Sequence, residues 1–195
     1  MTPGMENEPM KVYVVTEGKT EAAWLRWLLA PELMDENVEC HARDGQSSAV
    51  SMACTILGVH LEPVILVVDS DTTDPGKVAD VDQVIRAILG RVAPESMWRL
   101  YVAVPVIESW ILSDTRLLKE LFGVAPSSRE KSRLQQNPKA AMAKLFQQAH
   151  TTYTPKAIQE VTENKGASHL RETEPVRTIR HYIKELATLS SPAVR

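Results

Sequence analysis

Residues 64–71, VILVVDSD, place five consecutive apolar residues directly before two aspartates. An apolar run of this length is typical of a strand that is buried on both faces, and such strands belong to parallel sheets covered by helices. The two acids then stand at the carboxyl end of the strand, which is the edge of a parallel sheet where functional groups gather. The stretch therefore predicts a fold class and the edge at which a site is expected.

The same alternation of strand and helix patterns continues on both sides of this stretch. Short β-branched or apolar runs predict three further strands, at 11–16, 38–41 and 100–104. Apolar residues that recur every three or four positions predict four helices, at 20–33, 47–57, 80–89 and 107–122. The third of these is expected to begin at Asp80, because Asp80 and Gln83 resemble a capping box. The order β-α-β-α-β-α-β-α predicts an α/β fold, with a mainly parallel, Rossmann-like sheet flanked by helices.

The chain changes in character after residue 125. Residues 1–125 carry 10 Lys+Arg and 19 Asp+Glu, a net charge of −9, whereas residues 126–195 carry 12 and 6, a net charge of +6. Residues 126–138 are interpreted as a polar connection, 139–149 as a short helix, and Pro175 as the first position of an amphipathic helix. We expect a domain over 11–125 that holds the site and a basic helical extension over 126–195 packed on it. The basic part suits contact with phosphates, although attraction between the two halves explains the same asymmetry.

The composition also excludes several classes of protein. The first ten residues carry no apolar secretion core, and no apolar run approaches the ~20 residues of a membrane span. Cys40 and Cys54 are too few and too loosely spaced for a disulfide framework or a zinc knuckle, and the five histidines form no ligand spacing. We therefore expect a cytoplasmic protein without zinc and without a membrane partner.

The first predicted strand runs into Gly18-Lys19-Thr20, which looks like a phosphate-binding loop. A Walker loop needs another glycine five positions before Gly18, and that position holds Tyr13. Glu17 would also repel an anion. We therefore interpret Glu17 as the functional group, a strand-end carboxylate facing a metal, with Gly18 allowing the turn into the helix. Lys19 and Thr20, at the helix start, could contact a substrate phosphate. The alternative interpretation of the motif is that Glu17 is a solvated side chain and Gly18 an ordinary turn residue.

The second acidic stretch contains Asp69 and Asp71. Side chains alternate along an extended segment, so the two carboxylates are expected on one side. Carboxylates that lie close together repel each other unless a cation lies between them, and Mg²⁺ prefers such oxygen ligands. A loop of turns and caps is the alternative, because Asp74-Pro75-Gly76 follows.

The third acidic stretch, ESWILSD at 108–114, adds Glu108 and Asp114 as metal candidates. Glu108 follows the end of the fourth predicted strand and is the better candidate for a role at or beside a metal. Asp114 falls in phase with the apolar face of the predicted helix, where an unpaired carboxylate is costly and calls for a metal or a basic partner. Capping of a new helix that begins at Thr115 explains Asp114 equally well.

Taken together, these motifs identify a family that the chain resembles. With Glu17-Gly18 and Thr20-Glu21 after the first strand, and Asp69 and Asp71 after a later one, the sequence resembles the TOPRIM domain. This is the metal-dependent module of topoisomerases, primases, the small ribonuclease that matures 5S ribosomal RNA, and OLD-family nucleases. The stretch at 108–114 is similar to that of small bacterial TOPRIM-like proteins of the DUF4276 type, some of which are encoded beside ATPases in phage-defence loci. The resemblance covers about residues 11–122, and more loosely the tail with Pro138-Lys139 and Tyr153.

The resemblance implies a nuclease or phosphodiesterase that acts on DNA or RNA with Mg²⁺ or Mn²⁺. Glu17 would be a general acid/base or a metal ligand, and Asp69 and Asp71 would hold Mg²⁺. Glu108 would help to hold a second metal. The chain lacks the further domains of topoisomerases and primases and shows no tyrosine nucleophile, which leaves hydrolysis.

The remaining site residues are assigned to the phosphate. A basic group beside the phosphorus would assist the reaction, and Lys19 and Lys165 are both candidates. Gly18 and Thr20 are expected near a phosphate oxygen. An ATPase protein is the implied partner, together with a role in phage defence.

Two other functions stay open at this stage. Residues 69–73, DSDTT, also match the D-x-D-x-T motif of haloacid-dehalogenase-like phosphatases, in which Asp69 would be a nucleophile. That motif normally lies on the first strand of its family, whereas here it follows the third. The second alternative is a metal-binding subunit of an ATPase complex that does not itself turn over substrate.

Overall fold

The computed structural model describes residues 11–34, 37–163 and 165–190. The first ten residues, in which the sequence shows no secretion signal, and the last five of the predicted extension lie outside these ranges. None of the helices within these ranges is long and apolar enough to cross a membrane.

Four parallel strands form a single sheet in the order β2-β1-β3-β4. The strands are β1 (Val12–Thr16), β2 (Val38–Ala42), β3 (Val64–Asp69) and β4 (Trp98–Ala103). All six residues of β3 are buried, because this strand pairs with β1 on one side and β4 on the other and is covered on both faces. The predicted α/β class, with a parallel sheet flanked by helices, is confirmed.

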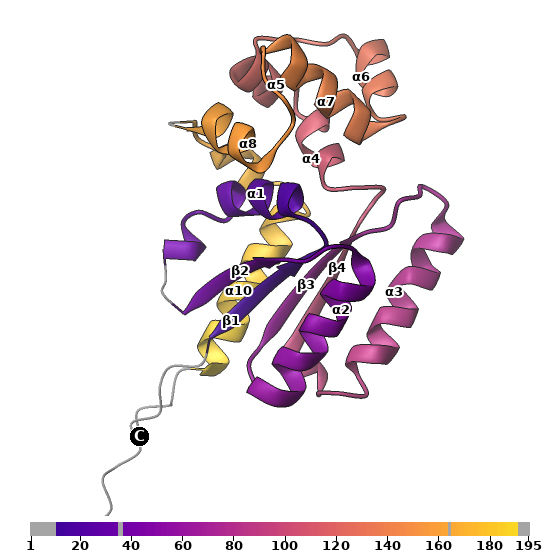
Figure 1. Ribbon diagram of the computed structural model, residues 1–195, viewed down its shortest axis with the longest axis vertical. Coiled ribbons are helices and arrows are strands. Elements are labelled where there is room, and N and C mark those ends of the chain that lie inside the picture. The colour runs from indigo at the N-terminus through magenta and orange to yellow at the C-terminus, as the bar shows by residue number, and fades with distance from the viewer. Residues whose placement is uncertain (1–10, 35–36, 164, 191–195) are drawn as a thin grey trace, which may run out of the picture.

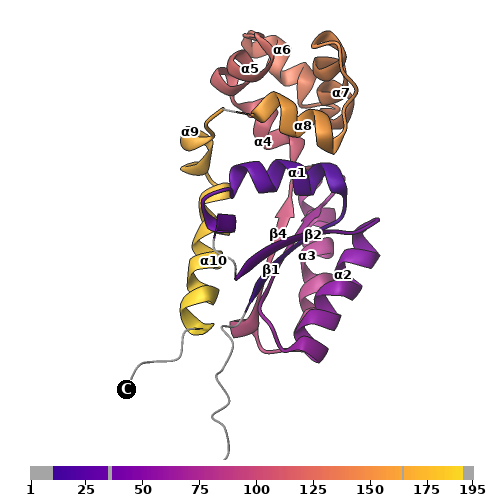
Figure 2. The same cartoon turned by 60° about the vertical axis from the view of Figure 1, so that its left-hand side comes forward.

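A helix follows each strand, and the first three of these helices return the chain to the start of the next strand. These helices are α1 (Lys19–Leu28), α2 (Gln46–Thr55, continued by a π-helical turn at Ile56–His60), α3 (Pro75–Leu89) and α4 (Glu108–Ser113). Helices α2 and α3 cover one face of the sheet, while α1 and α10 (Val176–Ser190) cover the other (Figure 2). Alternate strand residues therefore enter two separate cores, with Val14 on the α1 and α10 side and Val15 on the α2 and α3 side.

Four helices of the second half stand with α4 over the carboxyl edge of the sheet (Figure 1). They are α5 (Thr115–Phe122), α6 (Ser128–Leu134), α7 (Pro138–Gln148) and α8 (Pro155–Thr162), and we call them, with α4, the helical cap. The short α9 (Ser168–Arg171) connects the cap to α10. Met142 and Phe146 of α7 lie in the same hydrophobic cluster as Trp24 of α1, so the cap shares its core with the sheet domain. This packing holds the cap directly above the carboxyl ends of the strands.

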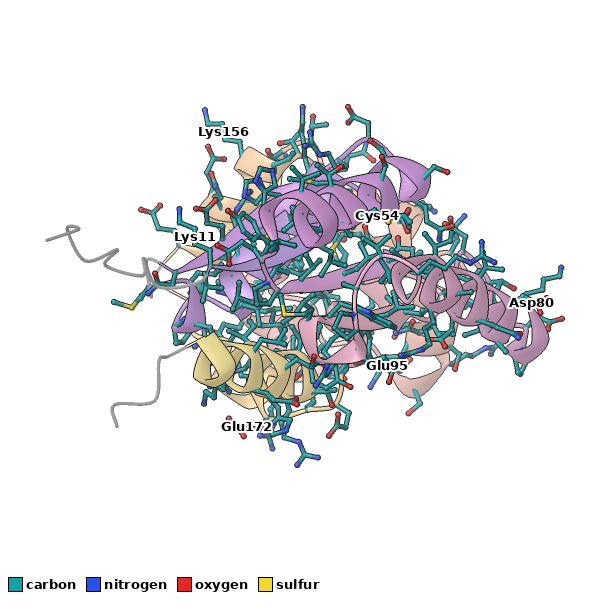
Figure 3. The ribbon with its side chains drawn as sticks, turned by 90° about the horizontal axis from the view of Figure 1, so that it is seen from below. Lys11, Cys54, Asp80, Glu95, Lys156 and Glu172 are labelled. Atoms are coloured by element: carbon teal, nitrogen blue, oxygen red, sulfur yellow. The ribbon has the colours of Figure 1, made fainter. Side chains whose placement is uncertain are left out.

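Several boundaries predicted from the sequence are wrong. Helix α3 begins at Pro75, not at Asp80, because Asp74 caps it by accepting hydrogen bonds from the next backbone N–H groups and Pro75 suits the first turn. Asp80 lies within the helix and points outward in Figure 3, among the charged side chains that surround the apolar interior. Residues 126–138, expected as a polar connection, contain α6, which is capped by Ser127 and Glu130 in a reciprocal capping box.

Candidate functional site

The ends of β1 and β3 bring Glu17 and Asp69 together. The backbone N–H of Asp69 donates a hydrogen bond of 2.9 Å to Glu17 Oε1. Gln46, the first residue of α2, lies against both positions: its Nε2 is 3.4 Å from Glu17 Oε1 and 3.2 Å from the carbonyl oxygen of Asp69. The two motifs, fifty-two residues apart in sequence, therefore form one structural unit.

Asp69 is buried at the centre of this edge, with 1% of its side chain exposed. Its Oδ1 accepts a hydrogen bond of 3.1 Å from the backbone N–H of Ile107, just before α4. Its Oδ2 lies 2.9 Å from Nζ of Lys139, the second residue of α7. Lys139 therefore joins the cap to the strand end by an ion pair.

Lys139 also lies near two other carboxylates. Its Nζ is 3.7 Å from Glu21 Oε1 and 3.8 Å from Asp71 Oδ1. Glu21 is buried in the first turn of α1, whereas 73% of the Asp71 side chain is exposed. Glu17, Glu21, Asp69 and Asp71, together with Lys139, thus make up what we call the acid cluster.

The sequence pattern predicts Asp69 and Asp71 on one side of an extended segment. The strand ends at Asp69, and Asp71 has a φ of 53°, in the left-handed region that aspartate tolerates better than most residues. The chain therefore turns between the two acids and is not extended there. They still approach the same lysine, because the turn keeps both at the carboxyl edge.

Gly18 is required for a different reason from the one expected. Its backbone is extended, with φ −144° and ψ 166°, so the turn itself does not demand glycine. A Cβ at Gly18 would lie 2.3 Å from Oε2 of Glu21, because that carboxylate folds back over the glycine. Thr20 donates its hydroxyl to the same Oε2 at 2.9 Å. Both residues therefore position Glu21 in the described structure.

Glu108 stands at the first position of α4 and is 1% exposed. The hydroxyl of Tyr153 donates a hydrogen bond of 2.7 Å to Glu108 Oε1, and the same hydroxyl accepts one of 2.9 Å from Trp24 Nε1. Glu108 Oε2 is buried and has no hydrogen-bond partner among the described residues. A buried carboxylate oxygen without a hydrogen-bond donor destabilises the fold unless another group compensates for the missing donor.

Burial raises the pKa values of three acids at this edge, Glu17, Asp69 and Glu108. For Glu17, burial together with the charges of Asp69 and Asp71 raises the pKa to about 7, against the hydrogen bonds that it accepts. Burial also raises the pKa of Asp69, although Lys139 opposes the shift. The pKa of Glu108 rises mainly through burial, with the hydrogen bond from Tyr153 opposing it. A carboxyl whose pKa lies near neutrality is suited to exchange protons at physiological pH.

Asp114, the remaining predicted metal ligand, has a different position. It is the N-cap of α5, and its Oδ1 accepts hydrogen bonds from the backbone N–H groups of Arg116 and Leu117 at 2.9 and 3.0 Å. It lines a cavity of about 810 Å³ with Trp110 and Gln135. The expected helix over 107–122 is broken at Asp114 into α4 and α5, so the capping interpretation accounts for this residue.

The two lysines proposed for the phosphate are both exposed. Lys19 is the first residue of α1, beside the acid cluster in sequence. Lys165 lies in the segment after α8, and its carbonyl oxygen accepts a hydrogen bond of 3.0 Å from Trp27 Nε1. The lysine that contacts the acids in the structure is Lys139, which the sequence analysis did not select.

The donor set fits a hard divalent cation in its chemistry. Carboxylate oxygens are the ligands that Mg²⁺ and Mn²⁺ prefer, and Glu108 Oε2 is a buried acceptor without a donor. Asp69 Oδ2 likewise has no aligned hydrogen-bond donor among the described residues, although the Lys139 ammonium lies close to it. Within 11–34, 37–163 and 165–190, however, no three His, Cys, Asp or Glu side chains are arranged as a ready metal-binding group. The lysine lies among the acids instead.

Three residues of the site were given no role from the sequence, although the family resemblance touches all of them: Glu21, Lys139 and Tyr153. Glu21 was visible as the last residue of the Glu17–Glu21 motif, at the buried start of α1. Lys139 and Tyr153 come from the cap, and their contacts span long sequence separations, such as the forty-five residues between Tyr153 and Glu108. Periodicity along the chain carries no information about which cap residue reaches which strand end.

Comparison with known proteins identifies the fold. No protein-family model and no curated protein sequence matches the chain. Among solved structures, the C-terminal region of the Xanthomonas campestris pv. campestris OLD protein aligns with a TM-score of 0.54 at 11% identity, over 91% of this chain and 96% of that one. The C-terminal region of the Burkholderia pseudomallei OLD protein aligns with a TM-score of 0.53 at 10% identity, over 91% and 98%. At such identities the likeness establishes a TOPRIM-like fold related to these regions, and the fold alone.

Proposed function

We propose that the chain is a Mg²⁺- or Mn²⁺-dependent nuclease that hydrolyses phosphodiester bonds in nucleic acid, in the cytoplasm. The observation that carries the proposal is the convergence of Glu17, Asp69 and Glu21 at the carboxyl edge of a sheet with the fold of OLD C-terminal regions. Carboxylates gathered at this edge of a parallel sheet are the arrangement from which such folds build sites.

Each acid has a proposed role. Asp69, Asp71 and Glu21 would hold a divalent cation, with Glu108 contributing its unpaired oxygen to a second ion or to the surroundings of the first. A bound cation supplies charge stabilisation at the phosphate and lowers the pKa of a bound water. Glu17 would accept or return a proton, because its pKa of about 7 leaves both protonation states populated at neutral pH.

The basic part of the chain supports contact with a polyanion. The cap stands over the carboxyl edge of the sheet (Figure 1), where the acid cluster lies, and carries exposed basic residues on two neighbouring helices. These residues are Arg129 and Arg133 on α6, and Lys144 on α7. Such groups attract phosphates in a salt-dependent manner. An ATPase partner and a role in phage defence remain predictions from the sequence resemblance.

The direct test is cleavage by the purified chain. Supercoiled plasmid and structured RNA are incubated separately with Mg²⁺, Mn²⁺ or EDTA, using the wild type and Glu17→Gln. We expect cation-dependent cleavage that Glu17→Gln lowers by about 100-fold or more, because the variant removes a proton-transfer group while keeping the shape. Glu120→Gln, an exposed acid on α5, is the matched control and should leave cleavage unchanged.

The outcomes separate the proposed function from its alternatives. Cleavage that is equal in wild type and Glu17→Gln contradicts the assigned role of the acid cluster. Cation binding without any cleavage favours the alternative of a metal-binding subunit. The phosphatase alternative requires a covalent phosphate on Asp69, so borohydride trapping of that intermediate would establish it in place of the nuclease.

A further inference from the structure

Lys139 occupies an unusual place for a surface lysine. It lies in the first turn of α7, and its ammonium lies within 4 Å of three carboxylates from two segments of the sheet edge: Glu21 of α1, and Asp69 and Asp71 at and after the end of β3. A lysine ammonium is ordinarily charged at neutral pH. Lys139 therefore places a positive charge among the acids, 2.9 Å from Asp69 Oδ2.

A positive charge at this point stabilises the acids against their mutual repulsion. The side chains of Asp69 and Glu21 are only 1% and 10% exposed, so water screens their mutual repulsion poorly. Three carboxyl groups beside one ammonium still leave more acidic than basic groups at this point. A divalent cation would neutralise this excess more completely than a single ammonium does.

We propose that Lys139 is the resident counter-ion of the acid cluster and occupies the place that a divalent cation takes, so that the cation must displace the lysine. This inference rests on the proposed function for the presence of the cation. It adds that the chain carries its own competitor for that cation, one that keeps the acids together in the metal-free protein.

The structure permits this exchange without unfolding the cap. The Lys139 side chain is 47% exposed, so its flexible stem can swing into solvent. The helix that carries it is held by the buried side chains of Met142, Leu145 and Phe146. Only the side chain has to move.

The experiment measures binding of Mn²⁺ alone by isothermal titration calorimetry. Lys139→Met should bind Mn²⁺ about tenfold more tightly than the wild type, because the cation no longer displaces a charged partner or meets its repulsion. Lys139→Arg keeps the charge and should stay within about threefold of the wild type. Lys144→Met, on the exposed surface of the same helix, is the matched control and should also match the wild type.

A second measurement uses thermal unfolding in EDTA. Lys139→Met should have a lower Tm than the wild type without metal, and Mn²⁺ should raise its Tm by more than it raises that of the wild type. Lys139→Arg should restore the wild-type behaviour in both conditions. Lys139→Gln provides a second neutral variant if the methionine variant folds poorly.

Equal or weaker Mn²⁺ binding by both neutral variants would overturn the proposal, as would the absence of Mn²⁺ binding from every variant. Competition for Mn²⁺ in a protein that cleaves neither DNA nor RNA would uphold the counter-ion role and contradict the nuclease. The two proposals can therefore fail separately.

Discussion

Two regions of the molecule carry acids that the sequence marks in the same way, yet the fold treats them differently. At the carboxyl edge of the sheet, Asp69 follows an apolar strand and is buried beside Glu17, with a lysine as its counter-charge. At the far end of α4, Asp114 follows an apolar turn and accepts hydrogen bonds from two backbone N–H groups. The same pattern, an acid after an apolar segment, thus gives a helix N-cap in one region and, in the other, a buried acid with an oxygen that lacks a hydrogen-bond donor in the described structure.

The largest expected difference between the two regions is in catalysis. Asp69→Asn should lower Mn²⁺-dependent cleavage by about 100-fold or more, because it removes a charge proposed to hold the cation while the amide oxygen can still accept from Ile107. Asp114→Asn should stay within about threefold, since asparagine caps a helix as well as aspartate does. Cleavage rates at saturating Mn²⁺ check both variants. An equal loss of cleavage in Asp69→Asn and Asp114→Asn would contradict the proposed difference between the two regions.

The pH dependence of stability sharpens the comparison at Glu17. Its pKa rises from 4.5 to about 7 on folding, so the folded state holds this proton more tightly than the unfolded state. The resulting stability is present in full below about pH 4.5 and is lost as the pH rises through 7. In EDTA, the free energy of unfolding of the wild type should therefore fall by about 2 kcal/mol more than that of Glu17→Gln between pH 4.5 and pH 8.

Urea denaturation at several pH values measures this slope. Glu120→Gln, which changes an exposed acid, should keep the wild-type slope. If the free energy of unfolding of Glu17→Gln changes with pH as that of the wild type does, folding does not raise the pKa of Glu17.

Tyr153 tests whether the cap supports the buried edge. Tyr153→Phe leaves Glu108 Oε1 and Trp24 Nε1 without their shared partner, so it should lower the free energy of unfolding by about 1–2 kcal/mol. Tyr182→Phe, on α10, is the control and should cost less. Chemical denaturation of both variants gives the comparison, and equal losses would show that the hydroxyl of Tyr153 has no special role.

The smallest predicted effect concerns the N-cap of α5, which Asp114 provides. Asp114→Ala removes an acceptor for two backbone N–H groups and should lower the free energy of unfolding by about 1 kcal/mol. Asp114→Asn should lose little, because it keeps the acceptor. If the asparagine variant is destabilised as much as the alanine variant, the negative charge matters and capping alone does not explain the residue.

The sequence was sufficient for the features that depend on local pattern. The continuous apolar run of Val64–Val68 and the alternation of strand and helix patterns predicted the parallel sheet, and the strand-end position of Glu17 and Asp69 predicted that they meet. These inferences succeed because parallel topology alone brings the carboxyl ends of strands to one edge.

The partners from the cap could not be predicted in the same way. Which side chain reaches Asp69 depends on how α7 packs on α1 and α4, and many exposed lysines of the extension look alike in sequence. The start of α3 was misplaced because two aspartates, Asp74 and Asp80, each carry a plausible cap pattern, and Pro75 decides between them only once the helix is seen. The role of Asp114 was ambiguous as well, because its sequence context fits both an inward-facing metal ligand and the N-cap of a new helix.

Binding of Mn²⁺ tests the central claim most directly, because it asks whether the acids at the carboxyl edge form a cation site before any substrate is involved. Titration calorimetry of the wild type, Asp69→Asn and Asp114→Asn compares the two regions under one condition. We predict saturable Mn²⁺ binding by the wild type and by Asp114→Asn, and its loss from Asp69→Asn. Undiminished binding by Asp69→Asn, or loss of binding from Asp114→Asn, would contradict the assignment of the site to the strand ends.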